Sequence, residues 1–309
     1  MTSITVVLTT HDRARLADRA LASIRAQTHG VDRVIVVDDA SHEPYDPPGD
    51  DVTLVRNPVN IGVCAARNRA LSLVDTDLVM FLDDDDWLGP DFVAEQVRGL
   101  ARTTLPGPVA ALGTRVFVGT DRSERRETAR TYVKGDDWMA DPASTTENSL
   151  VAPVPTLRAI GGFDPDLASW EHVDLMQRLT KVCSIEHNPS AEYFSPDCDG
   201  IPRLSSSWGK VANAIELTMA KHDDEIRRDR RVEARYLRAA AANHVMAHER
   251  RQGLRLAWRS VRVLPDRRSA KTLAQAILGP RLFIGVQRVA HRWRERSNPA
   301  TSAPASPAR

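Results

Sequence analysis

The chain has 309 residues, of which 42% are apolar and 27% charged, and its formal net charge is +1. No apolar stretch reaches the roughly 18 residues of a membrane span, and the first residues lack the basic leader and cleavage site of a signal peptide. Because the three cysteines, Cys64, Cys183 and Cys198, are odd in number and form no CxxC pair, we expect neither a disulfide framework nor a zinc site, and a reduced cytoplasmic setting fits best.

The net charge hides an asymmetry along the chain. Residues 1–220 carry 21 Lys and Arg against 33 Asp and Glu, whereas residues 221–296 carry 20 against 8. This contrast predicts two parts with different roles. We expect a large domain over residues 1–205, a basic helical appendage over 206–296 and a disordered low-complexity tail over 297–309.

Apolar runs and helical spacing alternate along the first part of the chain. Four apolar runs predict strands: ITVVLTT (4–10), RVIVVDDAS (33–41), VTLVRNP (52–58) and LVMFLDDDDW (78–87). Helical spacing appears at 13–27 and 62–74, and residues 109–118 predict a further strand. The polar segment 119–147 predicts a loop over the site. Residues 169–182 predict a helix with Ser169 as its N-cap.

Strands alternating with helices predict an α/β fold with a doubly wound, mostly parallel sheet flanked by helices. In such sheets, ligands bind beyond the carboxyl ends of the strands. Polar side chains gather at those predicted ends, in the segments 10–13, 38–39 and 83–86.

Four consecutive aspartates, Asp83 to Asp86, end one of these apolar runs. Mg²⁺ and Mn²⁺ prefer hard oxygen ligands, often one or two carboxylates completed by water and substrate phosphates. Asp83 and Asp85, two residues apart, can converge where a strand passes into a turn, so they form a candidate metal site. A solvated acidic turn is the alternative.

Six segments resemble the successive blocks of the family 2 glycosyltransferases, which are inverting enzymes of GT-A type. They are ITVVLTTHDRARLADRALASI, VIVVDDAS, NPVNIGVCAARNRAL, FLDDDDW, LRAIGGFDPDL and WEHVDLMQRL, in that order over about residues 3–185. The resemblance implies a nucleotide-sugar donor, usually a UDP-sugar, and a divalent metal, Mn²⁺ or Mg²⁺. It also implies a hydroxyl acceptor on a glycan, a lipid-linked glycan or a small molecule.

The resemblance also assigns residues to the donor site. Those implied beside the nucleotide base are Thr10, His11, Arg13 and Asp39, and those near the diphosphate are Asn60, Gly62, Arg67 and Asn68. Asp85 matches the direct metal ligand and Asp83 a metal or ribose contact, while Asp84 stands at the variable position between them and is counted with the nucleotide-binding residues. A surface turn for His11 and a surface ion pair for Arg67 are the alternatives.

The catalytic base departs from the family pattern. Where the family usually has an acidic pair after the GGFD turn, this chain has Glu171 and His172, followed by Asp174. A carboxylate or a histidine can deprotonate the acceptor hydroxyl. All three residues remain candidates. An ion pair with Arg178, one helical turn later, is the alternative for Asp174.

Two other functional classes compete with a transferase. The unusual Glu171–His172 pair also fits a nucleotide-sugar- or carbohydrate-binding protein that has lost catalysis. A sugar nucleotidylyltransferase is disfavoured because no Gly-rich loop follows the first strand. The basic appendage fits either a helical cap with solvated arginines or peripheral contact with the anionic inner face of a membrane. Nucleic-acid binding is not expected, since no recognition motif accompanies the charge.

Overall fold

A computed structural model describes residues 2–140, 142, 147–196 and 207–279 of the chain. The chain contains two compact units, which lie within Met1–Leu204 and Ser205–Arg309. The part of the expected basic appendage beyond residue 279 and the expected tail at 297–309 lie outside the described residues.

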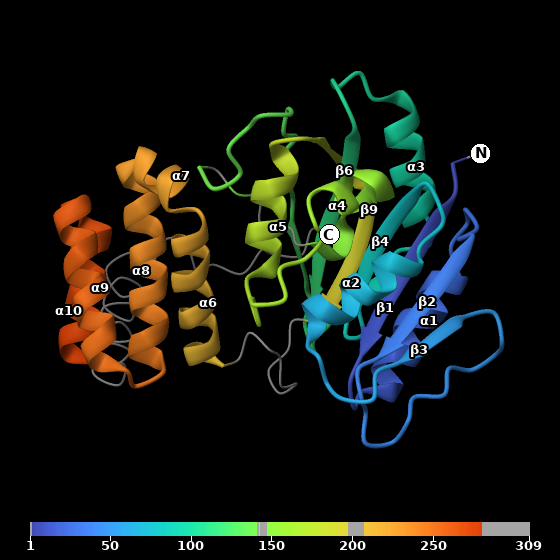
Figure 1. Cartoon of the computed structure of the whole chain (residues 1–309), viewed down its shortest axis with the longest axis horizontal. Helices are drawn as coiled ribbons and strands as arrows, with labels where there is room; N and C mark the ends of the chain where they lie inside the picture. Colours follow the sequence, from blue (N-terminus) through green and yellow to red (C-terminus); the bar gives the residue numbers. More distant parts are fainter. Residues whose placement is uncertain (1, 141, 143–146, 197–206, 280–309) are drawn as a thin grey trace, which may run out of the picture. The chain divides into compact units, whose positions relative to one another are not determined.

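The first unit is a mixed sheet covered by helices (Figure 1). Its strands are β1 (Ile4–Thr10), β2 (Arg33–Asp38), β3 (Thr53–Arg56), β4 (Leu78–Asp83), β5 (Trp87–Leu88), β6 (Val109–Val118), β7 (Glu124–Glu127), β8 (Val151–Pro153) and β9 (Ser184–Pro196). Its helices are α1 (Ala14–Arg25), α2 (Val63–Leu73), α3 (Phe92–Arg102), α4 (Val154–Ala159) and α5 (Glu171–Thr180), with a 3-10 turn η1 at Glu147–Ser149.

The strand order is β3-β2-β1-β4-β8-β6-β9-β5, and β7 pairs with β6. The neighbours β3, β2, β1 and β4 are parallel, as predicted, whereas β8 pairs antiparallel with both β4 and β6. The predicted α/β class is therefore confirmed, and the sheet becomes mixed beyond β4. The register places Thr10 opposite Asp38 and Thr9 opposite Asp83, so three polar strand ends share one edge.

The central strands β1, β2 and β4 are buried on both faces because most of their residues are apolar. Val7 and Phe81 point into a core that also contains Cys64 of α2 and Leu175 of α5. Their alternating neighbours, such as Leu8, point into a second core with residues of α1 and α3. Helices α2, α4 and α5 therefore cover one face of the sheet, and α1 and α3 cover the other.

Two local predictions were wrong. Helix α5 begins at Glu171, and Trp170, at φ 63°, occupies the N-cap position, so Ser169 does not cap it. The segment 119–147 is also more ordered than a loop where it is described, because β7 forms in it and Tyr132 makes a bridge to Ile185. Buried aromatic residues hold this segment against the sheet.

The second unit consists, over its described residues, of the helices α6 (Trp208–Lys221), α7 (Asp223–Arg228), α8 (Arg230–Met246), α9 (Arg250–Val263) and α10 (Arg267–Leu278). Helix α8 packs against α6 and α9, and α10 packs against α9 and α8. Gly253 allows α8 and α9 to approach closely, since a Cβ there would lie 2.6 Å from Val245. Among the described helices of the chain, none is both long and apolar enough to span a membrane.

Candidate functional site

The acidic turn after β4 gathers three carboxylates. β4 carries five buried residues to the sheet edge and ends at Asp83, where a backbone hydrogen bond of 3.2 Å from Asp86 N to Asp83 O closes a turn. One carboxylate oxygen from each of Asp83, Asp85 and Asp86 lies within 4.8 Å of the others. The structure therefore brings together the predicted pair, Asp83 and Asp85, and adds Asp86 to them.

Asp84, between these ligand candidates, points toward β1 instead. Its carboxylate accepts a hydrogen bond of 2.8 Å from Thr10 Oγ1 and one of 3.1 Å from Arg13 Nη1. Burial raises the pKa of Asp84 to about 6, although Arg13 and Thr10 oppose that rise. Thr10, Arg13 and Asp84 therefore form one contact group beside the acidic cluster, and Arg13 also lies 3.9 Å from Asp85.

A buried arginine neutralises part of the cluster. Arg67 of α2 is 1% exposed, and its Nη2 donates to Asp83 Oδ1 at 2.6 Å. Its Nη1 donates to Glu171 Oε1 at 3.3 Å, and its guanidinium lies 4.9 Å from the ring centre of Phe163. Burial alone would raise the pKa of Asp83, but Arg67, with Asn148, holds it below its ordinary value. The predicted surface alternative for Arg67 was therefore wrong.

Asp86 is held by two residues that the sequence did not mark. Asn148 of η1 donates from Nδ2 to Asp86 at 2.6 Å and to Asp83 at 3.0 Å. Ser195 of β9 donates from Oγ to Asp86 at 2.5 Å. Burial, and then the charge of Asp85, raise the pKa of Asp86 to about 7. The sequence could not identify Asn148, because an asparagine within a polar segment follows no recognisable pattern.

The donor set fits a hard dication. Three carboxylates converge at the cluster, where Arg67 pairs with Asp83 at 2.6 Å and Arg13 lies 3.9 Å from Asp85. Carboxylate oxygens are the ligands that Mg²⁺ and Mn²⁺ prefer. The residues present therefore suit a divalent metal.

The predicted base-binding residues surround the end of β1. His11 Nδ1 is buried without a hydrogen-bond partner, and His11 Nε2 lies 3.5 Å from Asp12 Oδ2. Asp12, at φ 56°, also accepts a bond of 2.6 Å from the His42 ring. This left-handed residue turns the chain out of β1 at the sheet edge. The role of His11 beside a base stays a prediction.

Asp39 organises the loop before α2. Its carboxylate accepts hydrogen bonds from Asn57 Nδ2 at 2.7 Å, Ile61 N at 3.0 Å and Gly62 N at 2.9 Å. Asn60 Oδ1 accepts from the same Gly62 N–H at 3.1 Å. Gly62 has φ 84°, which favours glycine, and a Cβ there would meet nothing within 4 Å. The loop thus presents an open backbone at the start of α2. The contact of Asp39 with a base stays a prediction.

The candidate bases at α5 have different surroundings. Glu171 is the first residue of the helix and contacts Arg67, which contacts Asp83, so it joins the acidic cluster through one arginine. Asp174 is buried and accepts hydrogen bonds from Arg178 Nε at 2.9 Å and Nη2 at 2.5 Å. The ion pair that the sequence offered as the alternative for Asp174 is therefore present.

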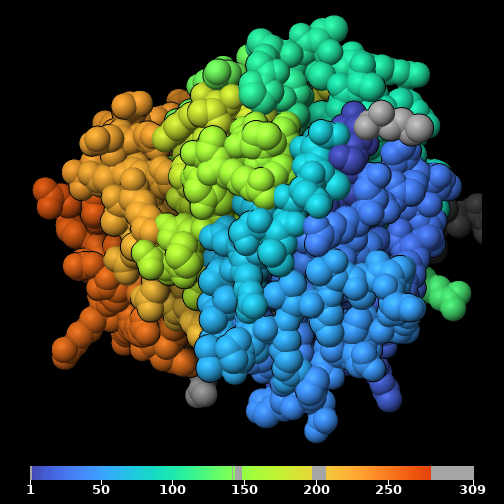
Figure 2. All heavy atoms as spheres, turned by 45° about the vertical axis from the view of Figure 1, so that its right-hand side comes forward, coloured from blue at the N-terminus to red at the C-terminus, as the bar shows by residue number. Residues whose placement is uncertain are grey.

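Helix α2 and the segment that contains α4 and α5 lie side by side on the sheet face that they cover, as Figure 2 shows for residues coloured cyan and yellow-green. Asn68 fixes that contact: its Nδ2 donates to Phe163 O at 2.6 Å, and its Oδ1 accepts from Phe163 N at 2.8 Å. This reciprocal pair positions the turn at 161–163, and with it the start of α5. Asn68 therefore acts on the protein's own backbone.

In the sequence, His187 precedes Asp197, Cys198 and Asp199 by about ten residues, and all four side chains are of types that can bind a metal ion. His187 Nε2 lies 3.3 Å from Thr114 Oγ1, and burial lowers its pKa. The other three residues lie outside the described part of the chain.

The sequence of this chain is similar to those of known glycosyltransferases. The family model described as "Glycosyl transferase family 2" matches residues 5–155. "Pre-mycofactocin glycosyltransferase" of Mycobacterium tuberculosis (strain H37Rv) is 30% identical over 198 residues, which cover 58% of this chain and 39% of that protein. "Succinoglycan biosynthesis protein ExoW" of Rhizobium meliloti is 36% identical over 116 residues, covering 33% and 35%. The chain spans less than half the length of these two relatives.

Solved structures share the architecture. The crystal structure of S. aureus TarS 1-349 in complex with UDP-GlcNAc superposes with a TM-score of 0.59 at 17% identity, covering 88% of this chain and 84% of that one. The same protein segment in complex with UDP gives a TM-score of 0.54 at 13% identity, covering 89% and 91%. At these identities the likeness shows the fold, and it confirms the predicted GT-A type.

Proposed function

The chain belongs to glycosyl transferase family 2 through residues 5–155, and we propose that it transfers a sugar, with inversion, from a nucleotide-sugar donor to a hydroxyl acceptor. The observation that carries this proposal is the convergence of Asp83, Asp85 and Asp86 at the sheet edge, beside the buried Arg67. A divalent metal held by these carboxylates would neutralise a diphosphate, which is the leaving group of such a transfer.

In this proposal the first unit holds the donor and performs the chemistry. Asp83 and Asp85, assisted by Asp86, would hold Mn²⁺ or Mg²⁺, which when bound supplies positive charge against the leaving diphosphate. The Gly62 backbone and its neighbours Asn60 and Arg67 would face the phosphates. Residues at the ends of β1 and β2, together with Asp84, would hold the nucleoside: Thr10, His11, Arg13 and Asp39.

We assign the base to Glu171 ahead of its neighbours. The acceptor oxygen attacks the anomeric carbon, the bond from that carbon to the diphosphate oxygen breaks, and the hydroxyl proton passes to a carboxylate. Glu171 is the candidate linked to the acidic cluster, through Arg67. Asp174 already pairs with Arg178, which makes it a helix-stabilising residue in this account. His172 remains the third candidate.

The test compares conservative variants in turnover and in donor binding. Glu171→Gln should bind donor nucleotide with an affinity close to wild type and lose at least about a hundredfold in turnover, as removal of a general base does. Asp174→Asn should lower the melting temperature and retain turnover at low temperature. Loss of turnover in His172→Gln, with Glu171→Gln active, would move the base to His172.

An inactive sugar- or nucleotide-sugar-binding protein is the second candidate, and the Glu171–His172 sequence favours it over an ordinary family member. It predicts donor binding without hydrolysis or transfer across a broad acceptor screen. It also predicts that substitutions at Glu171, His172 and Asp174 leave nucleotide affinity unchanged. Detectable donor hydrolysis that disappears in Glu171→Gln would eliminate this candidate.

The proposal also names a donor, an acceptor and a cellular location. A UDP-sugar is the proposed donor, supported by the fold likeness to a protein crystallised with UDP-GlcNAc. The proposed acceptor is a glycan, a glycolipid or a small natural product, in keeping with the names of the relatives. We place the protein in the cytoplasm, with residues 1–205 catalytic and the basic helices in peripheral contact with the inner face of the membrane.

A further inference from the structure

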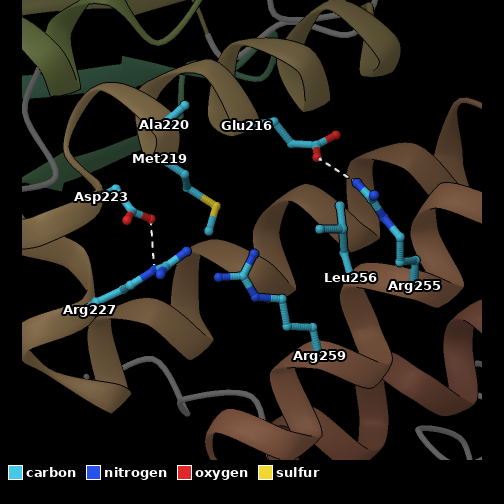
Figure 3. A pocket seen from close by; sticks show the side chains of 8 residues that line it. All are labelled: Glu216, Met219, Ala220, Asp223, Arg227, Arg255, Leu256 and Arg259. Carbon is cyan, nitrogen blue, oxygen red and sulfur yellow. Dashed lines mark hydrogen bonds and ion pairs between the residues drawn. The ribbon is translucent and has the colours of Figure 1, made fainter.

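A cavity of about 350 Å³ lies in the second unit, among helices α6, α7 and α9 (Figure 3). Its lining residues all belong to this unit: Glu216, Met219, Ala220, Asp223, Arg227, Arg255, Leu256 and Arg259. The acidic cluster of the first unit contributes nothing to it. The cavity therefore needs an explanation independent of sugar transfer.

Three arginines direct their guanidinium groups into this cavity, as Figure 3 shows. Arg227 extends from α7, and Arg255 and Arg259 extend from α9. Each has one described carboxylate partner: Asp223 at 2.8 Å, Glu216 at 3.4 Å and Glu233 at 2.7 Å respectively. Because a guanidinium carries five N–H donors, each retains donors beyond its ion pair.

Glu216, the described carboxylate partner of Arg255, also contacts two other side chains. Glu216 Oε1 lies 2.7 Å from His244 Nε2 and accepts from Gln252 Nε2 at 2.9 Å, and its Oε2 accepts from Gln252 at 3.0 Å. The contact with Arg255 is the longest of these. Glu216 therefore braces the α6–α8–α9 packing, and the Arg255 guanidinium is the least neutralised of the three.

The charge around the cavity is also positive. Residues 207–279 carry 16 Lys and Arg against 8 Asp and Glu. The remaining wall is apolar, since Met219 and Leu256 are both buried and border the same space. A ligand that fits would carry a compact anion for the arginines and a carbon portion for these two side chains.

We propose that this cavity binds a phosphate or diphosphate group through Arg227, Arg255 and Arg259. The planar guanidinium fork matches phosphate oxygens, and phosphate offers enough acceptors to engage several forks together. The group can belong to a lipid headgroup or to a soluble phosphate compound. Trp258, which is 56% exposed next to Arg259, supplies an amphipathic side chain suited to a lipid surface.

The test uses the full chain with EDTA, so that metal-dependent donor binding does not contribute. Inorganic pyrophosphate is titrated calorimetrically into wild type, Arg255→Gln, Arg227→Gln and Arg262→Gln. Arg262 is an exposed arginine of the same helix that does not line the cavity, so its variant removes an equal charge. Vesicles of phosphatidylcholine, with or without phosphatidic acid, are sedimented with the same four proteins.

We expect Arg255→Gln and Arg227→Gln to weaken binding about tenfold, the value of one lost charge-assisted contact, with Arg262→Gln close to wild type. This pattern with phosphatidic acid vesicles identifies a lipid phosphate, and the pattern with pyrophosphate alone identifies a soluble one. Absence of binding to both probes, or equal weakening in all three variants, would overturn the proposal. Thermal melts show whether each variant is folded; Arg255, with its one long contact, is the safest to replace.

Discussion

Replacement of Arg67 by methionine tests how the acidic cluster is held together. Arg67 is 1% exposed and pairs with Asp83 and Glu171. Methionine retains much of the side-chain volume but removes the guanidinium that pairs with both carboxylates. Removing one partner of a buried pair costs about 3–5 kcal/mol, and because the Asp83 side chain is 35% exposed, Arg67→Met should lose free energy of unfolding near the lower end, about 3 kcal/mol, in EDTA.

The pH dependence gives this prediction a second readout. Arg67 helps to hold the pKa of Asp83 below 3.8, so its stabilisation is present above pH 3.8 and is lost as the pH falls through the lowered pKa. In Arg67→Met, burial instead raises the pKa of Asp83, so the carboxyl group accepts a proton at mildly acidic pH. The destabilisation should therefore be smaller at about pH 5 than at about pH 7.

Urea unfolding followed by circular dichroism, in EDTA at both pH values, measures both effects. Arg69→Met is the matched control, because Arg69 lies on the same helix, is exposed and contacts Arg56 O and Asn57 rather than the cluster. A loss below about 1 kcal/mol for Arg67→Met, or a loss equal to that of Arg69→Met, would refute the role assigned to Arg67.

Two further predictions concern Asp86 and the glycine turn before α5. Burial and the charge of Asp85 raise the pKa of Asp86 to about 7, so the stability that Asp86 contributes is lost as the pH rises through that value. Asp86→Asn should therefore stabilise the EDTA-treated protein by about 2 kcal/mol near pH 8 and by less toward pH 4. A stability gain that does not depend on pH would contradict this prediction. Gly162→Ala places a Cβ 2.4 Å from Asn68 Oδ1 at φ +66°, whereas Gly161→Ala, at φ +83°, meets nothing within 4 Å. Both should destabilise in urea unfolding by about 1 kcal/mol or more from backbone strain, with Gly162→Ala worse, and equal losses would show that the Asn68 contact is unimportant.

The sequence predicted those parts of the site that follow from local pattern. Apolar runs ending in polar residues located β1, β2 and β4, and the register of parallel strands then placed these polar ends along one edge. Helical spacing alone offered the pairing of Asp174 with Arg178, as the alternative to a catalytic role for Asp174, and the structure contains this pair. Such features need only the periodicity of a single element or a pair of adjacent elements.

What the sequence could not show are contacts made over long separations. Asn148 reaches Asp86 from 62 residues away, and Ser195 reaches it from 109 residues away. Trp138 is buried although its surroundings in the chain are polar. The change to a mixed sheet beyond β4 has the same origin, because β8 is only three residues long and no run of that length predicts a strand.

The most direct test of the central claim is calorimetric titration of UDP into the purified protein, with and without Mn²⁺, for wild type, Asp85→Ala and Asp75→Ala. Asp75 carries an exposed carboxylate away from the cluster, so its variant controls for the loss of one negative charge. We expect wild type and Asp75→Ala to bind UDP in a Mn²⁺-dependent manner, and we expect Asp85→Ala to lose this binding. Binding that does not depend on Mn²⁺ or on Asp85, or no binding at all, would contradict it.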